Sequence, residues 1–143
     1  DRFWGYRKAL QSHRIEFDSR WEISDRSQYG KIDGQILYES CGLDAYVCNC
    51  DYAAHVVIQD LEKMGYSVPE DVSVVGFDDF LPIDLGMGTD RITSYSVDME
   101  RMAQICVKSM IKKIRHQKYA EGIQIVTGKI VEKQTVKDRT ESK

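Results

Sequence analysis

Long hydrophobic runs are missing from this chain of 143 residues. No apolar stretch approaches the roughly 20 residues that a membrane-spanning helix needs, so we expect no membrane partner. A charged segment followed by an apolar one, as in a secretory leader, is missing as well. The chain opens on "DRFWGYRKAL", without an initiating Met and inside an expected helix, which indicates a piece of a longer protein.

The chain has few cysteines and no net positive charge. Four cysteines are too few for a disulfide framework at this length, and they stand at Cys41, Cys48, Cys50 and Cys106. Most of them lie in apolar surroundings, which favours a reducing compartment and therefore the cytoplasm. The formal net charge is −3. Contacts to phosphates need clustered Lys and Arg. We therefore expect this mildly acidic chain, by itself, to bind nucleic acid poorly.

Helical and strand patterns alternate along the chain. Helices are expected over 2–14, 27–40, 51–65 and 98–116, and strands over 20–24, 44–49, 72–78 and 90–96. Two short strands, or one bent strand around Gly128, close the chain. Asp51 is suited to cap its helix and Gly65 to end it in the left-handed conformation. The order predicts an α/β fold, with a parallel sheet flanked by helices.

Polar residues follow three of the expected strands at their carboxyl ends. Asp78 and Asp79 follow the apolar strand of "VPEDVSVVGFDDF", residues 48–51 follow the strand before it, and Ser24 and Asp25 follow the first. Ligands of open α/β sheets bind beyond the carboxyl ends of the strands. We therefore expect these three strand ends to form one ligand-binding edge.

Catalytic and metal chemistry find little support in the sequence. Paired acids such as Asp78 and Asp79 can act as general acid and base, but a partner nucleophile or metal is not evident. The Cys48–Cys50 pair lacks the second pair, or the His, that a tetrahedral metal site needs. We expect no catalytic residue, no metal site and no cofactor, and hence not an enzyme.

Four segments, in order, resemble one family. The stretch "DAYVCNCDYAAHVVIQDLEKMGYSVPEDVSVVGFDDF" is similar to the effector-binding domain of the LacI/GalR transcriptional regulators. "DRFWGYRKAL" resembles the family's R-x-x-G-[FY]-x-x-A-[LM]. "DRITSYSVDMERMAQ" resembles its L-T-[TS]-[VI]-x-Q, and "IVTGKIVEKQT" its closing segment. The resemblance covers essentially the whole chain.

The resemblance implies a periplasmic-binding-protein-like fold of type I, in which two Rossmann-like subdomains are joined by crossover strands. Residues 1–89 then belong to the C-terminal subdomain. Residues 90–121 form a crossover strand and a helix that belongs to the N-terminal subdomain, and 122–143 are return strands and tail. The apolar stripe of that helix, with Met99, Cys106 and Met110, would lack its usual partners, so the fragment is expected to dimerise or exchange the segment.

The resemblance also implies five ligand-binding residues. Arg2 matches the family's ligand-contacting arginine, and Asp78 matches the first aspartate after G-[FY]. Cys50 stands where an Asn usually binds ligand, with Asn49 beside it. Arg26 lies near the place of an aromatic ring that stacks on ligand.

Departures from the family bear on the ligand. Cys50 is a poor hydrogen-bonding group, Arg26 replaces a ring, and Val97 stands where the family often has Gln. The implied effector is a sugar or a sugar derivative. The departures fit an anionic ligand, such as a sugar phosphate or acid, or a pocket that has drifted.

A homodimer is implied too, with an interface built from the helix at 52–64 and the loop at 81–88. The interface residues are expected to be Tyr52, Val56, Asp79, Phe80 and Leu81. The apolar face of the same helix could instead pack on the sheet.

The function implied is ligand sensing and dimerisation in a transcriptional repressor. A small effector would control DNA binding allosterically, and operator DNA would be bound only through a headpiece that is absent from this chain. A periplasmic sugar-binding protein of the same fold is the alternative. The segment "VPEDVSVVGFDDF" and the free cysteines favour the regulator.

Overall fold

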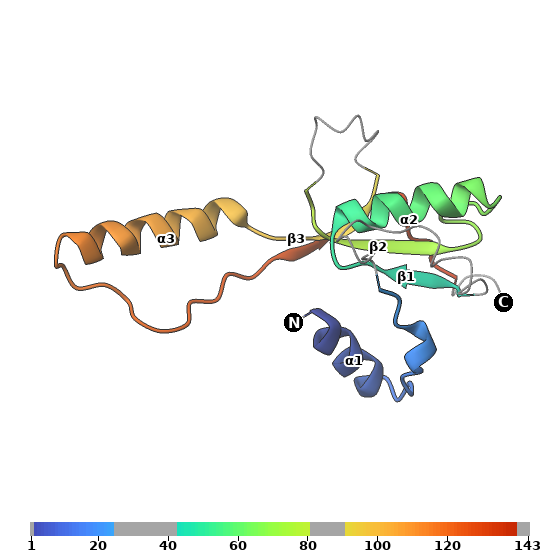
Figure 1. Cartoon of the computed structure of the whole chain (residues 1–143), viewed down its shortest axis with the longest axis horizontal. Coiled ribbons are helices and arrows are strands. Elements are labelled where there is room, and N and C mark those ends of the chain that lie inside the picture. The colour runs from blue at the N-terminus through green and yellow to red at the C-terminus, as the bar shows by residue number, and fades with distance from the viewer. Residues whose placement is uncertain (1, 25–42, 81–90, 140–143) are drawn as a thin grey trace.

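The computed structural model describes residues 2–24, 43–80 and 91–139. Its elements are α1 (Arg2–Ser12), η1 (Ser19–Trp21), β1 (Ala45–Val47), α2 (Asp51–Lys63), β2 (Ser73–Asp78), β3 (Thr93–Ser96), α3 (Met99–Ile114) and β4 (Lys129–Val131). The sheet has the order β1-β2-β3-β4, with parallel pairing except between β3 and β4. The expected α/β fold with a mostly parallel sheet is confirmed (Figure 1).

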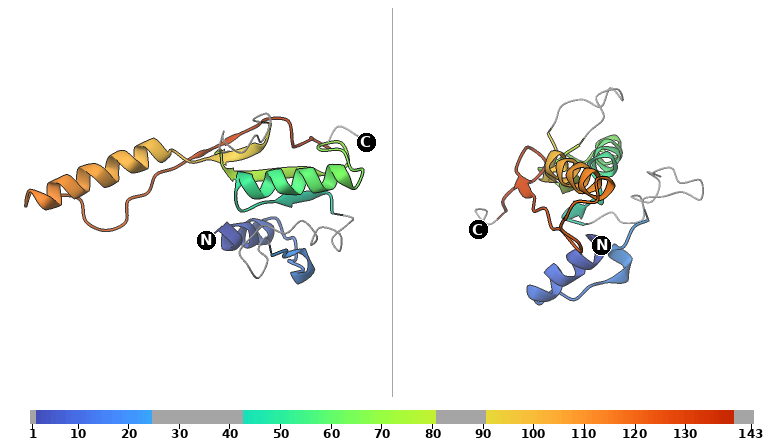
Figure 2. Two further views of the ribbon diagram at one scale, coloured as in Figure 1. Left: turned by 45° about the horizontal axis from the view of Figure 1, so that its top comes forward. Right: turned by 90° about the vertical axis from the view of Figure 1, so that its left-hand side faces the viewer.

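The helices take three different positions around this sheet. α2 lies along one face, and α1 lies on the other side of the sheet (Figures 1 and 2). α3 projects away from the sheet, at the end of the two adjacent segments that contain β3 and β4 (Figure 1). The sheet therefore has a covered face under α2 and an opposite face toward α1.

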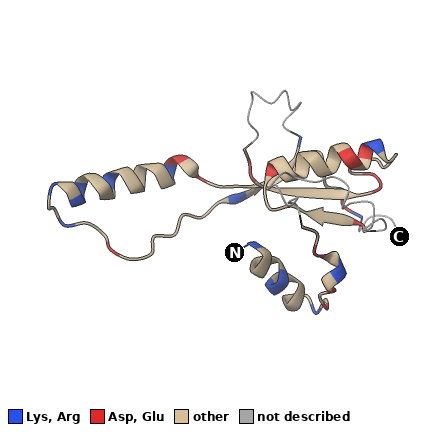
Figure 3. Ribbon diagram, in the orientation of Figure 1, with Lys and Arg blue, Asp and Glu red and all other residues tan. Residues whose placement is uncertain are grey.

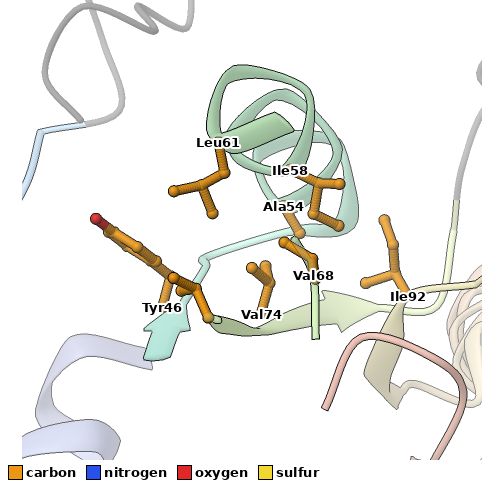
Figure 4. Close-up of a cluster of buried hydrophobic side chains, with 8 residues drawn as sticks. Tyr46, Ala54, Ile58, Leu61, Val68, Val74 and Ile92 are labelled. Carbon is orange, nitrogen blue, oxygen red and sulfur yellow. The ribbon is translucent and has the colours of Figure 1, made fainter. Parts of the chain in front are cut away.

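The hydrophobic core lies between α2 and the sheet. Ala54, Ile58 and Leu61 recur at helical spacing and are at most 3% exposed. They pack with strand and loop residues that include Tyr46 and Val74 (Figure 4). The apolar face of this helix, which the sequence left open between sheet and dimer partner, packs on the sheet.

The predicted strand at 20–24 is wrong, because a local turn forms there instead. The Asp18 carboxylate accepts hydrogen bonds from the Arg20 backbone N–H at 2.8 Å and from its guanidinium Nε at 2.9 Å. An Asp side chain that bonds to the backbone two residues on stabilises a turn. The result is the single turn of η1. The helix predicted over 27–40 lies outside the described residues.

The prediction that Asp51 caps α2 is wrong, because the N-cap is Cys50. The Cys50 sulfur accepts the Ala53 N–H at 3.5 Å, and Asp51 is the first residue of the helix. Gly65 has a φ of 90°, which confirms the left-handed end of the helix. Near Gly128 only one strand forms among the described residues, β4.

Asp51 is turned inward and ties three elements together. Its side chain is buried, at 2% exposure. Oδ1 accepts the Ser94 hydroxyl of β3 at 2.6 Å, and Oδ2 accepts the Phe80 N–H at 3.1 Å. The Ser94 oxygen in turn accepts the Asp79 N–H at 3.1 Å. One carboxylate thus holds the start of α2, the middle of β3 and the turn after β2.

Gly76 provides the space for this carboxylate. A Cβ atom at this position of β2 would lie 2.0 Å from Asp51 Oδ1 and 3.0 Å from Ile92 Cγ2. Both neighbours are buried, so neither can move away at low cost. The glycine of "VVGFD" is therefore required by close approach to Asp51.

Burial raises the pKa of Asp51 above its ordinary value. Loss of solvation penalises the ionised carboxylate, and the negative charges of Asp78 and Asp79 act in the same direction. The hydrogen bonds from Ser94 and from the Phe80 backbone partly offset this rise, because they stabilise the ionised form.

α3 has no buried residue within the described part of the chain. Asp98 caps it by accepting the Arg101 N–H at 2.8 Å, Glu100 lies in its first turn, and Lys112 and Lys113 lie in its last. Acidic groups at the start and basic groups at the end complement the helix dipole (Figure 3). Most of its apolar residues are exposed, with Met99 at 45%, Met110 at 63% and Ile114 at 70%. Cys106 of the predicted stripe is exposed as well.

Replacing Gly76 with Ala should destabilise the protein by about 1–3 kcal/mol, because the added methyl group overpacks the buried site against Asp51. The measurement is the free energy of unfolding in urea. Gly5→Ala is the control, since its added Cβ would meet nothing within 4 Å apart from its own helix backbone and chain neighbours, and Ala favours a helix. Equal unfolding free energies for the two variants would contradict the proposed close packing.

Replacing Asp51 with Asn should change how stability depends on pH. Because the pKa of Asp51 is raised in the folded state, the folded protein binds this proton more tightly than the unfolded chain does. Wild-type stability should therefore fall, relative to Asp51→Asn, as the pH rises above the unfolded value of 3.8, and it should level off above the folded pKa.

The slope of this difference cannot exceed about 1.4 kcal/mol per pH unit, the value for a single proton. Urea unfolding of both proteins between about pH 3.5 and 7 measures it. Asn suits the site because its oxygen can accept the Phe80 N–H while its amide donates to Ser94. Parallel pH profiles for the two proteins would show that Asp51 is not the titrating group.

Candidate functional site

Arg2 lies at the carboxyl ends of β1 and β2, on the face of the sheet opposite α2. Its guanidinium carbon is 4.0 Å from the centre of the Phe77 ring, and its Nη1 donates a hydrogen bond to the Asn49 carbonyl. A guanidinium over an aromatic face is attracted by the ring's negative potential. The structure thus brings α1 and two strand ends together through one side chain.

Phe77 and Tyr95 form the floor under Arg2. They are partners in the parallel register of β2 and β3, so their side chains lie on the same face. The rings stack with centroids 5.3 Å apart at 24°. The Tyr95 hydroxyl accepts the Gly128 N–H at 2.9 Å.

The backbone of Gly128 lies close to Tyr95 and Ser96. A Cβ atom there would lie 2.1 Å from the Ser96 carbonyl oxygen and 2.6 Å from the Tyr95 ring. A side chain at this position would therefore displace either the strand or the ring. The chain returning from α3 can approach β3 this closely only with glycine.

The two acids at the end of β2, Asp78 and Asp79, have different environments. Both have positive φ, 98° at Asp78 and 53° at Asp79, which is uncommon for residues with a side chain. The Asp79 carboxylate is paired with Lys133 at 2.6 Å, and the lysine side chain is only 13% exposed. Asp78 Oδ1 accepts the Phe80 N–H at 3.2 Å. Strained backbone of this kind is often found at ligand-binding sites.

The structure brings four of the five predicted ligand residues to neighbouring positions. Asn49 and Cys50 follow β1, Asp78 ends β2, and Arg2 bonds to the Asn49 carbonyl. The Cys50 sulfur faces the first turn of α2, where it serves as cap. Arg26 lies outside the described residues. We call Arg2, Asn49, Cys50, Phe77 and Asp78 the strand-end rim.

The predicted interface residues lie at the start of α2 and just after β2. Tyr52 is 39% exposed and Phe80 is 55% exposed, while Val56 is half-buried. Asp79 is engaged with Lys133, which gives its carboxylate a structural partner within the chain. Leu81 lies outside the described residues.

Phe77, Tyr95 and Lys133 were missed in the sequence as contributors to this site. Phe77 reads as an ordinary residue of an apolar strand. Tyr95 could have been noticed, because the motif L-T-[TS]-[VI] has an aliphatic residue where this chain has an aromatic one. Lys133 gives no local signal, since its partner Asp79 is 54 residues away.

Two hollows of about 520 Å³ each lie outside the rim, one between α3 and residues 119–126 and one beside α1. Within residues 2–24, 43–80 and 91–139, no group of three or more His, Cys, Asp and Glu could hold a metal ion. In the same ranges, no helix combines the length and apolarity needed to cross a bilayer.

Comparison with known proteins gives the same architecture. Residues 1–136 match the periplasmic binding protein-like domain. The HTH-type transcriptional repressor PurR of Serratia proteamaculans is 26% identical over 138 residues, which are 94% of this chain and 40% of that protein. The chain thus spans well under half the length of this curated relative.

Two solved structures share the fold. The transcriptional regulator CelR, in complex with cellobiose, has a TM-score of 0.75 and 22% identity over 94% of this chain and 41% of its own. A periplasmic binding protein/LacI transcriptional regulator of Alkaliphilus metalliredigens, in complex with D-xylulofuranose, has a TM-score of 0.74 and 20% identity. It is matched over 96% of this chain and 51% of its own.

These matches run over nearly the whole chain and agree with the four sequence segments and the sheet topology. The chain belongs to the periplasmic-binding-protein-like domain family.

Proposed function

We propose that these residues form one wall of an effector-binding cleft, and that the effector controls DNA binding by a headpiece outside this chain. The observation that carries the proposal is the position of Arg2, held on Phe77 beside the two strand ends. A guanidinium presents five donors in a fixed plane, and a carboxylate such as that of Asp78 offers only acceptors. Together they suit a small molecule rich in hydroxyl groups.

The ligand we propose is a sugar or a sugar derivative. The two similar structures described above hold cellobiose and D-xylulofuranose. In this chain Cys50 uses its sulfur as a helix cap, and Lys133 neutralises Asp79. Arg2 and the neutralised Asp79 reduce the negative charge near the rim, which favours an anionic group on the ligand, such as a phosphate or a carboxylate.

A homodimer through α2 and the turn after β2 is the second part of the proposal. Tyr52 and Phe80 are large, apolar and exposed, and both lie beside the buried Asp51 network that fixes their backbone. Exposed aromatic residues on a rigid frame are typical of protein interfaces.

We further propose that 1–89 and 122–143 belong to one subdomain and 90–121 to another. The support is the projection of α3 away from the sheet and its exposed apolar residues. In the intact protein these residues would pack on the N-terminal subdomain.

A periplasmic sugar-binding protein of the same fold is the alternative, since the matching domain takes its description from such proteins. The relatives favour the regulator. Sequencing upstream in the same reading frame separates the two. A helix-turn-helix of about 60 residues with a basic face would support the regulator, and a signal peptide would contradict it.

Replacing Arg2 with Lys in the intact protein should weaken effector binding by about tenfold or more, because lysine cannot present the planar set of donors. Isothermal titration against a panel of neutral sugars and sugar phosphates measures the affinity. Arg7→Lys is the matched control, since Arg7 lies on the same helix but over the Phe17 ring, 4.7 Å from its centre. Equal affinities for wild type and Arg2→Lys would remove Arg2 from the site.

Replacing Tyr52 with Asp should convert the proposed dimer to monomer, because it puts a charge into an apolar interface. Sedimentation velocity measures the mass of the intact protein. Trp4→Asp, at another exposed aromatic residue (62%) on α1, should leave the dimer intact. A Tyr52→Asp protein that stays dimeric would place the interface elsewhere.

A further inference from the structure

Tyr95 makes two contacts that lead in different directions. Its ring stacks under Phe77, which carries the Arg2 guanidinium on its face. Its hydroxyl accepts the N–H of Gly128, the residue immediately before β4. A valine or isoleucine, as in the family motif, could make neither the stack nor the hydrogen bond.

The first contact supports the position of Arg2. Phe77 is only half-buried, and the two neighbours described for its ring are Arg2 and Tyr95. Offset stacking of aromatic rings favours one arrangement of the pair. With an aliphatic residue at position 95, the Phe77 ring would lose its partner and gain rotational freedom. The guanidinium that rests on the ring would then lose its fixed place beside the Asn49 carbonyl.

The second contact lies where the chain enters and leaves α3. β3 runs toward the helix and β4 returns from it, with Tyr95 opposite Ile130 and Ser96 opposite Lys129 (Figures 1 and 2). These two strands are the connection between the sheet and α3 within the described residues. The Tyr95 hydroxyl crosses between them and holds Gly128, whose lack of a side chain lets the strand approach the ring.

We propose that Tyr95 is a positioning residue that holds Arg2 in place through Phe77 and ties this part of the strand-end rim to the strand returning from α3. This inference rests on the proposed function of the rim as a ligand-binding wall. Tyr95 itself need not touch the ligand.

The arrangement couples ligand binding to the orientation of α3. A tilt of α3 relative to the sheet must bend β3 and β4 near Gly128, and the hydrogen bond there connects the bend to the Tyr95 ring. A ligand held by Arg2 favours the one setting of this ring that supports the guanidinium. Such differential contact in two arrangements is what coupling between sites requires.

Two substitutions separate the two contacts. Tyr95→Phe keeps the ring and removes the hydroxyl, whereas Tyr95→Val removes both. In the intact protein without ligand, the ring-current shift of the Arg2 side-chain protons reports its place over Phe77, and Arg2→Lys assigns that signal. Amide exchange of Gly128 reports the hydrogen bond. Tyr6→Phe, at a half-buried tyrosine of α1, is the matched control for loss of a hydroxyl.

We expect Tyr95→Phe to keep the Arg2 shift and to speed Gly128 exchange by about tenfold or more, and Tyr95→Val to lose the Arg2 shift as well. Tyr6→Phe should change neither. An unchanged Arg2 shift in Tyr95→Val, or unchanged Gly128 exchange in Tyr95→Phe, would overturn the proposal. Should Tyr95→Val fail to fold, the Tyr95→Phe comparison still decides the contact to Gly128.

Binding probes distinguish this inference from the proposed function. Cellobiose and glucose 6-phosphate are titrated into wild type and both variants. For a probe that binds wild type, we expect about tenfold weaker binding to Tyr95→Val and near-normal binding to Tyr95→Phe. Equal binding to all three proteins would overturn the positioning role. If neither probe binds wild type, the proposed ligand class loses support, while the exchange and shift measurements still judge Tyr95.

Discussion

The buried carboxylate of Asp51 is the fixed point of this structure. It accepts one hydrogen bond from β3 and one from the turn after β2, and it begins α2. Charge in a dry site is costly, so the raised pKa of Asp51 is the consequence of placing it there. What the fold gains is a defined turn after β2, where Asp78 and Asp79 adopt their positive φ angles.

The two faces of the sheet make different contacts. On the α2 face, Gly76 makes room for Asp51, and the apolar residues of α2 cover the strands. On the opposite face, Phe77 and Tyr95 stack and carry Arg2. Adjacent residues of one strand therefore serve different purposes, since alternate side chains point to opposite faces. The packing on one face fixes the strand whose other face presents Phe77, on which Arg2 rests.

Much of this fold follows from local patterns in the sequence. The continuous apolar strand, the helical spacing of Ala54, Ile58 and Leu61, and the glycine after α2 are short-range signals, and all three were read correctly. The resemblance to LacI/GalR regulators led to the prediction of Arg2 and Asp78 as ligand-binding residues. Two predictions failed for local reasons: Asp18 turned the chain at the expected strand, and Cys50 took the capping role because Asp51 was drawn into the core.

What the sequence could not supply are contacts between distant residues. Asp79 meets Lys133 and Asp51 meets Ser94 only once the strands are in register. Tyr95 stacks with Phe77 and bonds to Gly128, which are 18 and 33 residues away in the sequence. Such contacts join the strand-end rim to the rest of the molecule.

A crystal structure of the intact protein grown with its effector is the most direct test of the rim as a ligand-binding wall. We predict that the ligand lies against the carboxyl ends of β1 and β2, with the Arg2 guanidinium and the Asp78 carboxylate hydrogen-bonded to it. A ligand found instead in the hollow between α3 and residues 119–126, with Arg2 still on Phe77 and free of contact, would contradict it.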